Sequence, residues 1–236
     1  MRDEQILRLE EMDSRHWWTQ TRLKIVSKSV ISCKLGDSKI FEIGAGSGGT
    51  LRYLKEKGFQ VIALEPTMYG SSTCNSIGIE TLNISFESLD FWPKNVGCIL
   101  LLDVLEHIED DLSTLRKLYN MADLGCHLVL TVPADPKLWS KLDEDVSHFR
   151  RYTLKSILST LENSGWEIQS YRYWMSILKP VVWFRRKIIR GDFNSETRLP
   201  SNLVNKILTF LVASEAVFPF IGRIPGTTIM LVVRKI

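Results

Sequence analysis

The chain has 236 residues, of which 44% are hydrophobic and 24% are charged, and its formal net charge is +3. This length and composition fit one globular α/β domain, and so small a charge gives no reason to expect a nucleic-acid partner. Four cysteines lie far apart, without a C-x-x-C pair or neighbouring histidines, so we expect reduced thiols, a cytoplasmic protein and no bound metal. The charged N-terminus is not followed by the apolar run of a signal peptide.

Residues 3–32 have the three- and four-residue apolar spacing that predicts helix, interrupted at His16, Trp17 and Trp18. Adjacent residues of a helix point to different sides, so one of the tryptophans can face something other than the core. Two interpretations stay open. Either the tryptophans pack on the sheet, or residues 1–35 form a helical lid over a ligand.

Residues 39–43 form a short β-favouring run that leads directly into a glycine-rich turn at 44–49. Such a turn between a strand and a helix lets the backbone approach a ligand closely. Gly44, Gly46 and Gly49 fit the dinucleotide pattern G-x-G-x-x-G. With Gly48 in place of Gly49, the same stretch fits the G-x-G-x-G of S-adenosylmethionine (SAM) sites. A purely structural tight turn is a third interpretation.

Glu42 favours SAM, because it lies two residues before Gly44, at the carboxyl end of the first predicted strand. A carboxylate there would repel a pyrophosphate but attract an ammonium group. The competing interpretation is that Glu42 forms a salt bridge with a nearby Lys or Arg.

The second predicted strand, 60–65, also ends in an acid, and Glu65 lies 21 residues beyond Gly44. At that distance a carboxylate can accept hydrogen bonds from both hydroxyls of a ribose, which supports a nucleoside ligand. A helix is expected at 67–77, a short third strand at 78–83 and a loop at 86–91.

The fourth strand, 96–102, is a nearly continuous apolar run, as expected for a strand buried on both faces, and it ends at Asp103. A helix at 110–121 and a fifth strand at 127–132 follow. The alternation of strands and helices predicts a parallel, doubly wound sheet with its ligand outside the carboxyl ends of the strands.

A polar loop at 134–152 precedes a helix from Thr153 to Glu162, a sixth strand at 166–174 and a seventh at 227–234. The helical insert between these strands, 175–225, contains an apolar helix at 202–218. Its charged residues Lys206 and Glu215 argue against a membrane span. Either the insert is a cap packed on the domain, or residues 180–218 contact a membrane surface at the inner face of the membrane.

The ordered motifs resemble those of class I SAM-dependent methyltransferases. They are Glu42-Ile-Gly-Ala-Gly-Ser-Gly-Gly49, Glu65-Pro66, Asp103-Val-Leu-Glu-His-Ile-Glu-Asp110 and Thr131-Val-Pro133. Within that class the chain resembles a bacterial group with further motifs outside the cofactor turn. Here these are His16-Trp17-Trp18 with Arg22, Trp139-Ser140, Asp143-Glu144 and His148-Phe-Arg-Arg-Tyr152.

The resemblance implies a single domain, 1–236, with a Rossmann-like α/β sheet of seven strands in the order 3-2-1-4-5-7-6, the last strand antiparallel. It also implies SAM as cofactor and the following cofactor-binding residues: Glu42, Gly44, Ala45, Gly46, Gly48, Glu65, Pro66, Ser85, Phe86, Asp103 and Val104. Ser85 departs from the family pattern, which has an acid at this position to contact adenine. Serine can accept that hydrogen bond without the charge, and Phe86 could pack against the ring.

If the methyl acceptor is a hydroxyl, a base would help, and an imidazole suits this role because it titrates near neutrality. His148 and His107 are the candidates, and His148 is the predicted catalytic residue. The alternative is that His148 only orders its loop. Arg150 and Arg151 could clamp an acidic or phosphorylated acceptor, or could be solvated surface residues. The predicted acceptor-binding residues are Trp17, Trp18, Arg22, His107, Trp139, Arg150, Arg151 and Tyr152.

The sequence therefore predicts a SAM-dependent methyltransferase that acts on a small-molecule or lipid- or sugar-linked acceptor, more readily at oxygen than at carbon or nitrogen. One alternative is a non-catalytic SAM-binding or partner-binding module. Another is an NAD(P)-dependent oxidoreductase, favoured by Gly49 and opposed by Glu42. The acceptor and the oligomeric state stay open.

Overall fold

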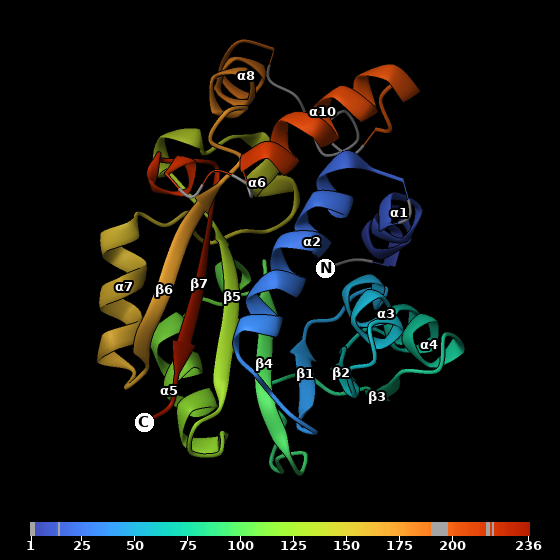
Figure 1. Cartoon of the computed structure of the whole chain (residues 1–236), viewed down its shortest axis with the longest axis vertical. Coiled ribbons are helices and arrows are strands. Elements are labelled where there is room, and N and C mark those ends of the chain that lie inside the picture. Colours follow the sequence, from blue (N-terminus) through green and yellow to red (C-terminus); the bar gives the residue numbers. More distant parts are fainter. Residues whose placement is uncertain (1–2, 14, 190–197, 216–217, 219) are drawn as a thin grey trace.

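The computed structural model describes residues 3–13, 15–189, 198–215, 218 and 220–236 (Figure 1). Its strands are Lys39–Ile43 (β1), Val61–Leu64 (β2), Glu80–Leu82 (β3), Val96–Leu102 (β4), His127–Pro133 (β5), Glu167–Trp174 (β6) and Thr228–Arg234 (β7). The longer helices are Asp3–Asp13 (α1), Trp17–Ser32 (α2), Gly49–Glu56 (α3), Met68–Ser76 (α4), Asp111–Met121 (α5), Leu154–Asn163 (α7) and Asn202–Glu215 (α10). Short helical segments are Leu105–His107 (η1), Pro136–Leu138 (η2), Lys141–Asp145 (α6), Lys179–Phe184 (α8), Arg185–Ile189 (η3) and Ile221–Arg223 (η4).

The seven strands form one sheet in the order β3-β2-β1-β4-β5-β7-β6, which confirms the predicted topology. Strands β1 to β5 pair in parallel, and β7 runs antiparallel to both β5 and β6. Glu42 pairs with Leu100 of β4, and Ile43 with Leu64 of β2, so these parallel strands end at one edge. That edge carries Glu42, the glycine turn, Glu65 and Asp103.

Helices cover both faces of the sheet and bury two apolar cores. Helices α5 and α7 close the first core through Leu115, Leu118, Ile157 and Leu161, all fully buried. On the other face α2, α3, α4 and α10 close the second core (Figure 1). The near-continuous apolar sequence of β4 is explained by this double coverage.

The N-terminal segment forms two helices that meet near His16, as the interrupted pattern predicts. Helix α2 packs on the sheet, and the rings of Trp17 and Trp18 are half-buried against the second core. Helix α1 instead lies on the glycine turn and α4: Ser47 Oγ donates to Asp13 Oδ2 at 2.6 Å, and Tyr69 donates to Glu10. The role of residues 1–35 as a lid stays a prediction.

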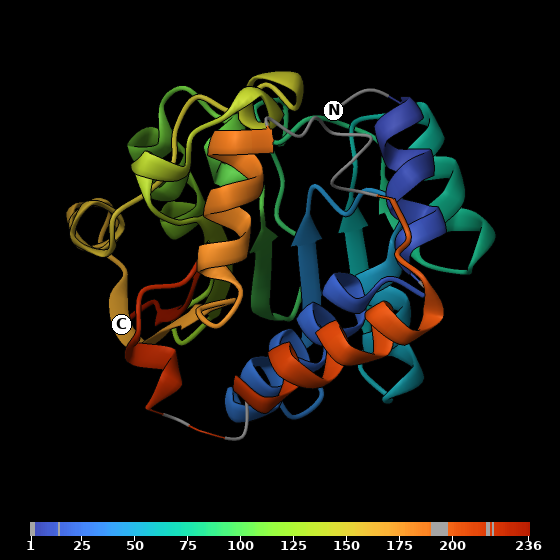
Figure 2. The same ribbon diagram turned by 90° about the horizontal axis from the view of Figure 1, so that it is seen from above.

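The insert before β7 is helical, and α10 lies alongside α2 (Figure 2). Asn205 accepts a hydrogen bond from the Trp17 backbone and donates one to the Arg15 carbonyl. At the other end of α10, buried Glu215 accepts from the backbone of Ser176 and Ile177. One face of α10 is thus docked on the domain. None of the described helices combines the length and apolar character needed to cross a bilayer.

The sequence predicted a loop at 134–152, where the structure has two short helices, η2 and α6. Helix α6 begins with a capping box in which Ser140 and Asp143 exchange hydrogen bonds. The S-x-x-D spacing of Ser140 and Asp143 is the sequence signal for this helix start. The predicted helix at 202–218 is observed to Glu215, and 216–217 lie outside the described residues.

Candidate active site

The glycine turn folds tightly against the end of β4. Gly44 has a φ of +74°, and a Cβ added there would lie 2.7 Å from Cγ2 of Val104, so only glycine fits without displacement. The Gly46 amide donates to Glu65 at 2.8 Å, and Gly48 precedes the first turn of α3. These contacts bring the predicted cofactor residues of three strands together.

Glu42 is buried at the base of this turn, with 3% of its surface exposed. Its Oε2 has no hydrogen-bond partner, and none of the described residues forms an ion pair with it. Burial raises the pKa of Glu42 to about 8, and the charge of Arg22 opposes this rise. The interpretation of Glu42 as half of a salt bridge is therefore wrong. A buried carboxylate with one oxygen free of partners among the described residues fits the ammonium group of SAM.

Glu65 is buried and already holds the turn. Its Oε2 accepts from the Gly46 amide, and its Oε1 accepts from the amide and hydroxyl of Thr67 at 2.9 and 2.7 Å. A carboxylate has about four acceptor positions, so capacity remains for a ribose hydroxyl. The neighbouring Pro66 is exposed.

Asp103 follows β4 with a φ of +56°, a strained conformation for a residue with a side chain. It pairs with Arg22 at 3.1 Å, and the same guanidinium donates to the Leu102 carbonyl and lies over the ring of Trp18. Arg22 and Trp18, predicted to bind the acceptor, thus lie beside the predicted cofactor residue Asp103.

The two residues predicted to contact adenine, Ser85 and Phe86, already contact other protein groups. Ser85 Oγ lies 3.1 Å from Ser88 Oγ within its own loop. Phe86 is 6% exposed, packs in the first core and has Lys117 Nζ 4.9 Å above its ring. Protein atoms therefore surround most of the Phe86 ring, and its contact with adenine stays a prediction.

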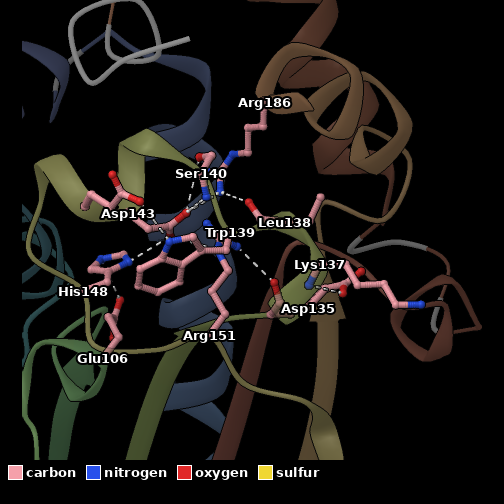
Figure 3. A network of polar contacts seen from close by, with 12 residues as sticks. Glu106, Asp135, Lys137, Leu138, Trp139, Ser140, Asp143, His148, Arg151 and Arg186 are labelled. Atoms are coloured by element: carbon pink, nitrogen blue, oxygen red, sulfur yellow. Dashed lines mark hydrogen bonds and ion pairs between the residues drawn. The ribbon is translucent and has the colours of Figure 1, made fainter. Parts of the chain in front are cut away.

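Asp143 of α6 lies at the centre of a buried polar network (Figure 3). Its Oδ1 faces His148 Nδ1 at 3.0 Å and accepts from Arg151 Nε at 2.8 Å. Its Oδ2 accepts from the Ser140 backbone and from Arg186 at 3.5 Å. Burial raises the pKa of Asp143, but the His148 hydrogen bond and the charges of Arg151 and Arg186 outweigh burial and lower it below its usual value.

The other side of His148 faces η1. Its Nε2 lies 3.7 Å from Glu106 Oε1, and its ring meets that of His107 edge-on with centroids 4.6 Å apart. Glu106 is 1% exposed, and none of the described residues forms a hydrogen bond with its Oε2. Burial raises the pKa of Glu106 well above its usual range, and burial together with the charge of His148 lowers that of His107 to about 4.

The remaining predicted acceptor residues hold the loop. Arg151 is buried, donating to Asp143 and the Ala134 carbonyl. Arg150 pairs with Asp111 and donates to the Glu109 carbonyl. Tyr152 is buried in the first core, with its hydroxyl on Asp111. The interpretation as a solvated surface residue is therefore wrong for Arg151, whose side chain is 3% exposed, whereas the Arg150 side chain is 30% exposed.

Three acids in this region were not predicted as site residues: Asp13, Glu106 and Asp143. Glu106 and Asp143 were inside the motifs that carried the resemblance, beside His107 and before His148. Their burial was the missing information, since no sequence pattern marks which acid of a polar loop turns inward. Trp139 is half-buried beside this network, and its indole nitrogen donates to Glu144 at 3.4 Å.

Comparison with known proteins agrees with this geometry. A family model for a methyltransferase domain matches residues 21–171. No curated protein matches the chain. A SAM-dependent methyltransferase from Mesorhizobium loti has the same fold at 14% identity, covering 85% of this chain and 92% of its own, with a TM-score of 0.58.

Two further structures are similar. A SAM-dependent methyltransferase from Thermotoga maritima is 15% identical over 100% of both chains, with a TM-score of 0.60. The geranyl diphosphate C-methyltransferase from Streptomyces coelicolor A3(2) is 10% identical, covering 90% of this chain and 79% of its own, also with a TM-score of 0.60. Identities this low establish a common fold.

The sheet order, the glycine turn and the acids at the strand ends together define a class I SAM-dependent methyltransferase. The match to residues 21–171 shows that the chain belongs to the methyltransferase domain family. The protein is thus an enzyme with SAM as its cofactor. The alternatives of a non-catalytic module and of an NAD(P)-dependent oxidoreductase are set aside.

Proposed function

We propose that this enzyme transfers the SAM methyl group to a hydroxyl oxygen of a small-molecule or lipid-linked acceptor. The observation that carries the proposal is the placement of His148 between Asp143 and Glu106, next to the strand end that bears Asp103. A hydroxyl must lose its proton as the new C–O bond forms. A site that combines an imidazole with carboxylates suits that requirement.

The cofactor side follows from the strand ends. Glu42, whose Oε2 has no hydrogen-bond partner among the described residues, would take the ammonium group, and the remaining acceptor capacity of Glu65 would take a ribose hydroxyl. The glycine backbone would pass close to the methionine part. Bound SAM supplies an electrophilic methyl group on a positively charged sulfur. Positioning and exclusion of water then account for much of the rate.

The acceptor hydroxyl would lie over η1, where His148 controls its proton. Asp143 holds the Nδ1 side of this imidazole and Arg151 holds Asp143, so the ring has one defined orientation. His107, which meets His148 edge-on, lines the same place.

Two measurements test this function. Calorimetry should show one SAM site and no NAD binding at comparable concentration. Incubation with methyl-labelled SAM and fractions of small molecules and lipids should give a product whose label is in an O-methyl group. Label in an N-methyl or C-methyl group would contradict transfer to oxygen, and lack of SAM binding would overturn the function itself.

A lipid-linked acceptor is favoured by exposed apolar side chains of the insert. Those that are at least 45% exposed include Val181, Trp183, Phe184, Ile188, Ile189, Leu203, Val204, Ile207 and Phe210. Residues 175–225 contain eight basic residues and three acids, Asp192, Glu196 and Glu215. Of these acids, Glu215 is buried. Exposed apolar groups with an excess of basic ones suit an anionic membrane surface.

Helices α8 and α10 lie at the end of the molecule that carries the strands' carboxyl ends (Figure 1). Membrane contact there would place the active site near lipid head groups, at the inner face of the membrane for a cytoplasmic enzyme. Sedimentation with phosphatidylcholine vesicles, with and without phosphatidylglycerol, tests the contact.

We expect binding that requires the anionic lipid and is weakened at least about tenfold by Trp183→Ser with Phe210→Ser, since each buried aromatic contributes about 1.5–3 kcal/mol. Leu124→Ser is the matched control, because Leu124 is 78% exposed outside the insert. Equal binding by both variants would contradict the membrane contact.

A further inference from the structure

Glu106, His107 and His148 form a compact group of potential metal ligands. One ligand atom from each lies within 4.8 Å of the other two. Glu106 and His107 come from η1, and His148 follows α6. The sequence predicted no metal because no histidines cluster along the chain. Folding of 134–152 onto η1 creates this group.

The group has unsatisfied bonding capacity. Glu106 Oε2 is buried and has no hydrogen-bond partner in the described part of the chain. Its other oxygen is 3.7 Å from His148 Nε2, which is too long for a hydrogen bond. A cation bound by the Glu106 carboxylate and the His148 imidazole would give both side chains a partner.

The orientation of His148 matches that of a metal ligand. Asp143 Oδ1 lies 3.0 Å from Nδ1, which assigns the ring proton to that nitrogen and leaves the Nε2 lone pair directed toward Glu106. A carboxylate behind a histidine is the arrangement that orients ligating imidazoles in metal sites. Arg151 and the Ser140 backbone hold Asp143 in turn.

We propose that Glu106, His107 and His148 bind one divalent transition-metal cation, such as Zn²⁺ or Mn²⁺, which holds the acceptor hydroxyl. Two imidazole nitrogens and one carboxylate suit these ions, and three protein ligands leave a coordination position open. This rests on the proposed function. It makes His148 a ligand that acts on the acceptor through the cation, in place of a free base.

The cation would lower the pKa of the hydroxyl, whose proton leaves to solvent. The oxygen then forms a bond to the methyl carbon as the carbon–sulfur bond breaks, and that electron pair stays on sulfur. No oxidant or reductant is needed.

The test is calorimetric titration of the full chain, first treated with a chelator, with ZnCl₂ and with MnCl₂. We expect one site per chain, and a loss of affinity of at least about a hundredfold in Glu106→Gln and His148→Ala. His127→Ala is the control, since it removes a histidine at the far end of β5 and should change affinity less than twofold. The visible spectrum of the Co²⁺-loaded protein gives a readout besides activity.

His107→Ala is the second variant if His148→Ala fails to fold, and an unchanged SAM affinity shows that the fold is intact. Absence of metal binding up to millimolar concentration, or equal binding by all variants, would overturn the site. If the chelated protein binds SAM and methylates at full rate without metal, the cation's role falls while the proposed function stands. If the protein binds no SAM, both the proposed function and the cation's role in it are contradicted. The metal titration still tests the metal site by itself.

Discussion

Glu42 shows how a residue that suits a ligand can lower the stability of the unliganded protein. Its carboxylate lies among protein groups with one oxygen unpartnered, while Gly46 and Thr67 satisfy the nearby Glu65. A buried acid without a partner favours its protonated form. The pKa of Glu42 is therefore raised because the unliganded site offers its carboxylate too few partners. The same raised pKa makes the stability of the unliganded protein depend on pH.

The change Glu42→Gln should weaken SAM binding at least about tenfold and stabilise the unliganded protein at high pH. Because the folded-state pKa is about 8 against 4.5 for an ordinary Glu, this group's stabilising contribution is present below pH 4.5 and is lost as pH rises through 8. At about 1.4 kcal/mol per pKa unit, the advantage of the variant should grow by on the order of 5 kcal/mol between pH 4 and 9. Urea unfolding across this range measures it.

Exposed Glu56, on α3, provides the control, and Glu56→Gln should follow the wild-type pH profile. A Glu42→Gln profile parallel to wild type would show that Glu42 is ionised in the folded protein at neutral pH.

Gly44→Ala should reduce SAM affinity at least about tenfold and lower the melting temperature. The new methyl group would overlap Val104 and occupy a left-handed backbone position, which costs about 1–2 kcal/mol by itself. Gly36→Ala separates the two effects, because Gly36 has a φ of +56° with no atom within 4 Å of an added Cβ. It should lose a similar backbone contribution yet keep its SAM affinity. Loss of affinity in both variants would contradict the close approach to Val104.

At the scale of elements, α6 connects the loop after β5 to the insert. Asp143 binds His148 and Arg151 from its own segment and Arg186 from η3. Lys187 of η3 also donates to the Trp139 carbonyl. The capping box of α6 thus does two things: it starts the helix and it presents an acid to three cationic or ionisable side chains.

Asp143→Ala should lower the free energy of unfolding by about 3 kcal/mol, because it leaves the buried charge of Arg151 without its partner. Glu144→Ala on the same helix is the control. Glu144 is exposed and makes one long bond to Trp139, so its loss should cost less than about 1 kcal/mol. Denaturant unfolding measures both, and equal effects would show that the network does not act as a buried unit.

At the scale of the molecule, one sheet with two covered faces buries every cysteine. Cys33, Cys74, Cys98 and Cys126 are free and buried, and burial raises the pKa of Cys74 and Cys126 to about 12. We expect the native protein to react slowly with a thiol reagent such as DTNB, and four thiols to react once it is unfolded in urea. Rapid reaction of two or more thiols in the native protein would contradict this packing.

Much of the fold was predictable because its signals are local. Apolar runs such as 96–102 mark buried strands, and the glycines at 44–49 mark the turn. The strand order, including the antiparallel β7, was predicted correctly from the resemblance to class I methyltransferases. The acids at strand ends were predictable for the same reason: parallel strands bring their carboxyl ends to one edge.

The acceptor side was less predictable because its residues meet across the chain. Glu106 and His148 are separated by more than forty residues, and only the fold of α6 and its loop brings them together. Burial also decided the roles of Arg151 and Tyr152, whose side chains turn into the protein.

The sequence by itself thus determined the class of fold, the cofactor turn and the acids around it, since strand pattern and glycine spacing act over short distances. Only the tertiary structure decided which ionisable side chains are buried, which remain unpartnered, and that Glu106, His107 and His148 lie together. The physical reason is that desolvation and ion pairing depend on the neighbours that packing supplies, and these neighbours are distant in sequence.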